Sequence, residues 1–230
     1  MKNGVSSCEI ARSMEITQKS AWFLLHRVRE MMRTGSEEKF TGTVEVDEKY
    51  VGGLEKFKHT DKKFNLGRGG AGKQIVLGIL MRSLNKGESK IKAKVIPNTT
   101  RETLHRHVRD NITPGSEVMT DAHLSYRGIS PEMIHAWVDH SFLYAEGRVH
   151  CNGTENFWSL FSRMMHQYTH IDPRHLQGYL DELICRFNAR KMSCLAQFIE
   201  TLMNAPGRRL TYRTLTERGL MNIVSVKEHG

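Results

Sequence analysis

The sequence predicts an α/β protein in which a mixed five-stranded sheet is flanked by helices, with a partial helix-turn-helix at the N-terminus. Apolar residues follow a helical period up to about residue 33 and alternate with polar residues from Thr43 onward. From Thr43 the pattern indicates three strands, a helix, a short strand, a further short strand and then helices. This order is typical of one mixed sheet with helices packed on it.

Two helices are expected in residues 1–35. A short helix over residues 8–14 precedes a longer one from Gln18 to about Arg33, which Thr17 can cap. Lys19 and Arg27 face outward on the longer helix, where a recognition helix would contact DNA in the major groove. The same pattern is also typical of an ordinary helical hairpin.

The sheet begins with the alternating segment TVEVDEKYV at Thr43, which places Val44 and Val46 on one face and Glu45 and Asp47 on the other. Asp121 stands at the C-terminal end of the short fourth strand, EVMT. The remaining predicted elements are strands at Gln74–Met81, residues 90–97 and residues 137–141, and a helix at Arg101–Asn111.

A long basic loop is expected between the first two strands, over residues 53–73. It holds six Lys or Arg residues against two acids, an excess of four positive charges. Long loops of this kind are usually functional or disordered, and we expect this one to contact the backbone of a nucleic acid. Its cations are Lys56, Lys58, Lys62, Lys63, Arg68 and Lys73.

The stretch His150–Arg163, HCNGTENFWSLFSR, predicts a core-packed helix that Asn152 or Thr154 can cap. Glu155 lies in its first turn. Another helix is expected after Asp172, and the chain becomes basic toward its C-terminus. We therefore expect three parts: the helix-turn-helix segment 1–35, an α/β domain over 42–192 built on the sheet, and a basic C-terminal helix and tail over 193–230.

Three carboxylates are candidate metal ligands, although each has an ordinary alternative. Asp47 could face solvent from a strand, and Asp121 could cap a helix. Glu155 could simply be an acidic residue that the helix dipole stabilises in the first turn. The order of elements is that of a ribonuclease-H-like sheet, in which the first strand is central and the fourth lies beside it. Asp47 and Asp121 could then be neighbours, with the Glu155 helix packed across the sheet. Three converging carboxylates repel one another without a cation, so the pattern predicts two Mg²⁺ or Mn²⁺ ions.

Charge and composition favour a polyanionic partner. The formal net charge is +9. No apolar run approaches the roughly 18 residues of a membrane span, and the N-terminus is no signal peptide. The four cysteines have no CxxC spacing, which favours reduced thiols and gives no structural zinc site. We expect a cytoplasmic, nucleoid-associated protein.

The motifs VEVDEKYVGG, GRGGAGK, TDAHLSY, HAWVDHS, HCNGTENFWSL and YLDELICRFNAR resemble, in this order, the ISXO-type insertion-sequence transposases of bacteria. The resemblance implies a ribonuclease-H-like DDE transposase that uses two divalent metal ions. It implies that Asp47, Asp121 and Glu155 are the catalytic, metal-binding triad, with Asn152 and His150 beside the active site. The implied partners are double-stranded DNA, as the element's terminal repeats and the target, and further copies of the chain.

The chain also departs from the family pattern. Members usually carry an N-terminal zinc ribbon and a complete helix-turn-helix, whereas this chain begins just before the penultimate DNA-binding helix. Many have Lys seven residues after the catalytic Glu, where this sequence has Ser162, with Arg163 adjacent as a candidate DNA contact. Two other functions therefore stay open: a non-catalytic DNA-binding remnant or regulator, and a stand-alone ribonuclease-H-like nuclease.

Overall fold

The structure is a computed structural model. It describes residues 4–33, 35, 38–52, 73–85, 87–121, 124–129, 132–138, 151–168 and 171–217. The chain forms two compact units, one from residues 36–158 and the other from residues 1–35 together with 159–230. The division falls inside one helix, between Trp158 and Ser159. The three-part division at 1–35, 42–192 and 193–230 stays a prediction.

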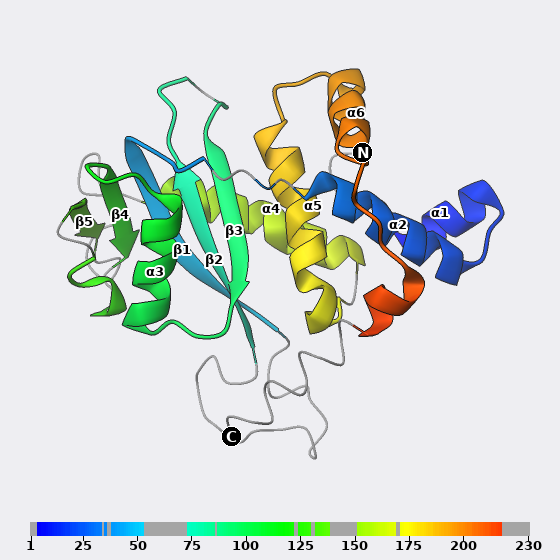
Figure 1. Cartoon of the computed structure of the whole chain (residues 1–230), viewed down its shortest axis with the longest axis horizontal. Coiled ribbons are helices and arrows are strands. Elements are labelled where there is room, and N and C mark those ends of the chain that lie inside the picture. Colours follow the sequence, from blue (N-terminus) through cyan, green and yellow to red (C-terminus); the bar gives the residue numbers. More distant parts are fainter. Residues whose placement is uncertain are drawn as a thin grey trace, which may run out of the picture. The chain divides into compact units, whose positions relative to one another are not determined.

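The unit of residues 36–158 is built on a five-stranded sheet with the order β3-β2-β1-β4-β5 (Figure 1). β1 pairs antiparallel with β2 and parallel with β4, so the first strand is central and the fourth lies beside it, as the sequence predicts. The mixed α/β fold is thereby confirmed. The strands are β1 (Thr43–Val51), β2 (Gln74–Met81), β3 (Lys90–Ile96), β4 (Glu117–Asp121) and β5 (Ile134–Val138).

The two faces of β1 have different roles. Val44 and Val46 are fully buried in an apolar cluster that includes Leu104 and Val108 of α3 (Arg101–Asn111). Since side chains alternate along a strand, Glu45 and Asp47 project to the opposite face. That face receives the first turns of α4 (Asn152–Tyr168), as the contacts of Thr154 and Trp158 show. β1 thus places Val44 and Val46 in the apolar cluster on one side and Glu45 and Asp47 on the other.

Two predicted elements differ in detail. β5 begins at Ile134, three residues before the predicted start, while residues 139–141 lie outside the described part of the chain. The helix that Asp121 could cap is, where described, one short 3-10 turn, η3 (Leu124–Tyr126). The buried ring of Tyr126 makes that turn part of the core.

The second unit contains α1 (Ser7–Met14), α2 (Gln18–Met32) and α5 (Leu176–Asn188), which follows the 3-10 turn η4 (Pro173–His175). Thr17 caps α2, since its hydroxyl accepts a hydrogen bond from the Ser20 amide at 3.1 Å. A buried ion pair joins α2 to α5, with Arg29 Nε donating to Glu182 Oε2 at 2.9 Å. The guanidinium of Arg29 also lies 3.7 Å from the ring centre of Tyr179.

α6 (Cys194–Met203), in the same unit, has an inverted distribution of side chains. Its large apolar residues are exposed, whereas Gln197 and Thr201 are half-buried. Gln197 donates from its side-chain amide to the carbonyl of Ala189. The exposed apolar residues, here called the α6 stripe, are Leu195, Phe198, Ile199, Leu202 and Met203. Their i, i+3, i+4 spacing places them on one face of the helix.

All four cysteines are free thiols; Cys8 and Cys194 are exposed, and Cys151 is buried. Among the described helices, none combines the length and the apolar composition that a membrane crossing requires.

Candidate active site

Three carboxylates converge where β1 and β4 run side by side. Asp47 and Glu48 come from β1, and Asp121 is the last residue of β4. Each offers one oxygen, and these oxygens all lie within 4.8 Å of one another. The parallel register explains the meeting: Glu45 pairs with Met119, and the same offset brings Asp47, in the middle of β1, level with Asp121 at the end of β4.

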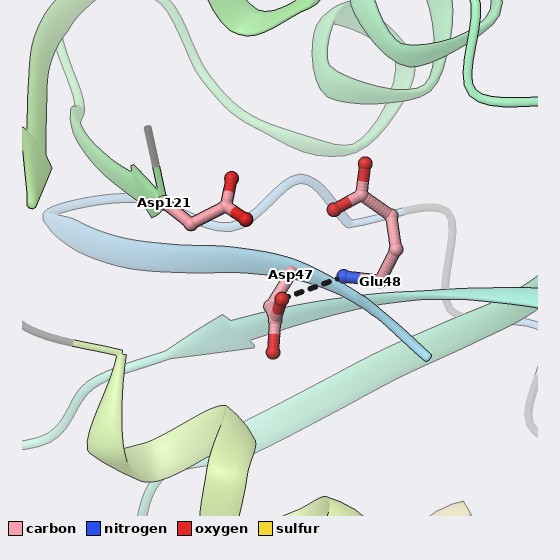
Figure 2. Close-up of side chains that lie close together, drawn as sticks. All are labelled: Asp47, Glu48 and Asp121. Atoms are coloured by element: carbon pink, nitrogen blue, oxygen red, sulfur yellow. Dashed lines mark hydrogen bonds between the residues drawn. The ribbon is translucent and has the colours of Figure 1, made fainter. Parts of the chain in front are cut away.

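The three side chains approach from different directions (Figure 2). The Glu48 and Asp121 carboxylates lie on one side of the β1 ribbon and turn toward each other, while the Asp47 carboxylate lies on the other side with one oxygen still within 4.8 Å of theirs. Asp47 is held by two hydrogen bonds: its Oδ1 accepts from the Glu48 amide at 2.8 Å, and its Oδ2 accepts from Trp158 Nε1 at 2.8 Å. The orientation of Asp47 is therefore fixed by its own strand and by α4.

Burial and the neighbouring negative charges make the ionised carboxylates unfavourable in the absence of a cation. Burial raises the pKa of Asp47, and the charges of Asp121 and Glu155 raise it further, while the Trp158 hydrogen bond lowers it. Burial raises the pKa of Glu48 to about 8, against the lowering effect of its hydrogen bond with Tyr126. Burial is the main reason that the pKa of Tyr126 lies well above its ordinary value, and the charge and hydrogen bond of Glu48 raise it further. A cation at this position would stabilise the ionised carboxylates.

Glu155 approaches the site from α4 but does not join the tight group. It is an exposed residue in the first turn of that helix, and the group within 4.8 Å contains Glu48 instead. Its charge nevertheless contributes to the raised pKa of Asp47. Glu155 therefore lies near enough to Asp47 to act on it electrostatically.

The other predicted site residues are only partly within the described chain. Asn152 is the exposed first residue of α4, and His150 lies outside the described residues. Of the candidate DNA contacts, Lys19 and Arg27 on α2 and Arg163 on α4 are exposed, and Lys73 before β2 is half-buried. The remaining candidates, Lys56, Lys58, Lys62, Lys63 and Arg68, fall in the stretch 53–72, which the structure does not describe. DNA contact by any of them stays a prediction.

Sequence reasoning missed Glu48, Trp158 and Tyr126. Glu48 directly follows Asp47, and strict alternation assigns it to the opposite face of the strand, away from a shared site. Trp158 follows Glu155 by three residues, and a Trp on a core-packed helix is commonly an ordinary core residue, although its indole N–H requires a partner when buried. The adjacent acids of VEVDE carry the signal that could have found Glu48.

The donor set suits a hard divalent cation. Carboxylate oxygens are the ligands that Mg²⁺ prefers, and Mg²⁺ usually takes few protein carboxylates while keeping waters and substrate phosphate. Asp47 and Asp121 bring one oxygen each into the group, and Glu48 brings a third. The residues present fit a divalent metal.

Comparison with known proteins gives two matches. The family model described as the ISXO2-like transposase domain matches residues 39–188, which include Asp47, Asp121 and Glu155. A Haemophilus influenzae (strain ATCC 51907 / DSM 11121 / KW20 / Rd) protein described as an "uncharacterized transposase-like protein" is 30% identical over 115 residues. That match covers 50% of this chain and 94% of the relative.

Proposed function

The chain belongs to the ISXO2-like transposase family, and from that membership we propose that it is a DDE transposase of an insertion sequence. In this proposal it cleaves DNA at the ends of the element and joins the freed 3′-hydroxyls to target DNA, with two divalent metal ions at the site. It works on DNA in the cytoplasm, at the nucleoid.

The observation that carries the proposal is the convergence of Asp47 and Asp121. The two residues come from strands that are distant in the sequence but paired in the sheet, and both carboxylates enter one oxygen cluster. Acidic residues that gather on a surface by chance remain exposed to solvent, whereas Asp47 is buried enough to raise its pKa. A metal site explains the burial.

In this proposal Asp47 and Asp121 hold the metal ions and Glu155 completes the set from α4. When bound, divalent ions lower the pKa of a coordinated water or hydroxyl and stabilise the charge that develops on phosphate oxygens. Trp158 keeps Asp47 oriented through its hydrogen bond. Glu48 adds a further carboxylate next to Asp121, so metal binding can draw on four acids rather than three.

The basic residues are proposed to hold the DNA backbone. The net charge of +9 favours a polyanion, and Lys19, Arg27 and Arg163 offer exposed cations. Lys73 and the other cations of the 53–73 segment are proposed as further backbone contacts. Asn152 and His150 are proposed to lie beside the carboxylates of the active site. Phosphate contacts of this kind give affinity without sequence preference.

A second copy of the chain is the proposed partner of the α6 stripe. Its five side chains are exposed by 47% to 75%. At roughly 100 Å² each, they offer on the order of 500 Å² per chain, so two facing copies would remove about 1,000 Å² from water. That area reaches the lower bound of specific interfaces. Glu200 is the one charged residue of the helix, so little charge opposes self-association.

The test is a strand-transfer assay with the full chain, Mg²⁺ or Mn²⁺, a duplex ending in the element's terminal repeat, and a target plasmid. Joined products support a transposase. Cleavage without joining would favour the stand-alone nuclease, and binding with neither would favour the non-catalytic remnant or regulator. Either of these two results would contradict the proposal.

A further inference from the structure

Glu45 is a buried carboxylate that the proposed chemistry does not use. It lies on β1 two residues before Asp47, and only 1% of its surface is exposed. Because side chains alternate along a strand, Glu45 and Asp47 share the face that receives α4. A charged side chain in this position is unfavourable unless it is paired and hydrogen-bonded. The hydrogen-bond partners of Glu45 therefore indicate its role.

One oxygen of Glu45 binds the sheet and the other binds the helix. Oε1 accepts a hydrogen bond from Arg82 Nε at 2.6 Å, just beyond the end of β2. Oε2 accepts from the backbone amide of Thr154 at 2.9 Å, and the Thr154 hydroxyl lies 3.4 Å away. The Thr154 amide is among the first four of α4, which have no partner within the helix. Glu45 thus supplies a negative charge at the positive end of α4.

Gly153 shows how closely α4 approaches this carboxylate. A Cβ at Gly153 would lie 2.9 Å and 3.0 Å from the two oxygens of Glu45 and 3.0 Å from Leu80 Cδ2. Real side chains essentially never show the shortest of these separations, so a side chain at Gly153 would force the Glu45 carboxylate or the first turn of α4 to move. The first turn of α4 is therefore seated directly on Glu45.

A second anchor lies one turn further along α4. Trp158 donates to Asp47, and its ring packs on Gly78 of β2, where an added Cβ would come within 2.8 Å of Cζ2. Glu155 follows Thr154 immediately and precedes Trp158 by three residues. The two anchors therefore bracket Glu155 and fix the part of the helix that carries it.

We propose that Glu45 is a positioning residue of the active site: by holding the first turn of α4 through Thr154, it sets the direction in which Glu155 reaches toward Asp47. This role rests on the proposed function, because it assigns Glu45 to the placement of a metal-binding group. Arg82 supports this role by pairing with Glu45 Oε1 and holding the carboxylate in its orientation. Glu45 itself touches neither metal nor DNA.

The test compares Glu45→Gln with a matched control, Glu182→Gln. Glu182 is also a buried carboxylate that pairs with arginines, Arg29 and Arg186, both at 2.9 Å. Both substitutions remove a buried charge and should lower the free energy of unfolding in urea. Mn²⁺ affinity and the cleavage rate at saturating Mn²⁺ are then measured on the folded fraction of each variant.

Glu45→Gln is expected to lower Mn²⁺ affinity or the cleavage rate by about 10- to 100-fold, the range typical of residues that orient metal ligands. Glu182→Gln should leave both unchanged. Equal values in the two variants would show that Glu45 is structural only, and would overturn the proposal. If the wild-type chain binds Mn²⁺ but does not cleave DNA, the proposed function fails while the affinity comparison still decides the role of Glu45. Absence of Mn²⁺ binding by the wild type would contradict both.

A second pair of variants approaches the same contact from the helix. Gly153→Ala pushes directly on the Glu45 carboxylate and should reproduce the loss in affinity or rate. Gly178→Ala on α5 is its control, because a Cβ there meets nothing closer than 3.9 Å. If Glu45→Gln does not fold, this pair decides the question: equal metal affinity and cleavage in the two alanine variants would overturn the positioning role.

Discussion

The indole Nε1 of Trp158 donates a hydrogen bond to Oδ2 of Asp47 at 2.8 Å. The bond joins α4 to β1 at the carboxylate proposed to bind metal. It also lowers the pKa of Asp47, against the larger effect of burial. Trp158 is therefore the α4 residue that acts most directly on the orientation and the pKa of Asp47.

Trp158→Phe keeps an aromatic ring beside Gly78 and removes the N–H donor. The pKa of Asp47 should rise, and Mn²⁺ affinity near neutral pH should fall by about tenfold or more, because metal binding requires the ionised carboxylate. Isothermal titration with Mn²⁺ measures this. Trp137→Phe, at a site that is 55% exposed on β5, serves as the control and should bind as the wild type does. Equal affinities in the two variants would show that the hydrogen bond does not tune the site.

The sequence predicted the parts of the site that depend on local pattern. Alternation in TVEVDEKYV assigned Asp47 to the face opposite Val44 and Val46, and the order of elements placed Asp121 on the neighbouring strand. Glu48 escaped prediction because alternation places it on the face of β1 opposite Asp47, whereas Asp121 at the end of β4 turns toward Glu48 on that face.

The interior of the second unit escaped prediction for a different reason. Apolar periodicity identifies the buried face of a helix by its hydrophobic residues, whereas the deepest side chains of α2 include His26 and Arg29. Arg29 is buried because Glu182 supplies its charge partner from 153 residues away. A pairing at such a distance leaves no mark in the local sequence. Glu45, buried against Arg82 and Thr154, was missed for the same reason.

Acid should destabilise the unit that contains His26. Burial, with Arg29 and His175 nearby, lowers the pKa of His26 from 6.5 to about 3. A folded-state pKa below the unfolded value means that the stabilisation is present above pH 6.5 and is lost as the pH falls toward 3. His26→Phe removes the titrating group from this aromatic cluster and should flatten the loss. Urea unfolding at about pH 7 and about pH 5 measures the difference.

His166→Gln is the control for this measurement, since His166 is exposed on α4. It should lose stability with acid as steeply as the wild type. An identical acid dependence in His26→Phe and in the wild type would show that His26 does not titrate in this range on unfolding.

The α6 stripe should determine the oligomeric state. Phe198, 59% exposed, lies near the middle of the stripe, so Phe198→Lys would place a charge in the proposed interface. Size-exclusion chromatography with light scattering should find a dimer for the wild type and a monomer for Phe198→Lys. Glu200→Lys adds a lysine to the same helix outside the stripe and should remain dimeric. A monomeric wild type at high concentration would contradict this assignment.

The basic 53–73 segment should contribute salt-dependent affinity. Replacing Lys56, Lys58, Lys62 and Lys63 by Ala should weaken binding to all duplexes alike, because phosphate contacts carry no sequence preference. The slope of log affinity against log salt should flatten by about 0.9 for each DNA phosphate that the variant no longer neutralises. Fluorescence anisotropy over a salt series measures this slope. A slope equal to that of the wild type would show that these lysines do not bind the backbone.

The central claim, that Asp47 and Asp121 hold the metal ions for DNA cleavage, is tested most directly with Asp121→Asn. This substitution keeps the shape of the side chain and removes the negative charge from the oxygen cluster. The measurement is the rate of Mg²⁺-dependent nicking of a terminal-repeat duplex, with DNA affinity determined in parallel. We predict that nicking falls at least about 100-fold, because metal stabilisation of the transition state contributes several kcal/mol, while DNA affinity is retained. Nicking by Asp121→Asn at the wild-type rate would contradict the account.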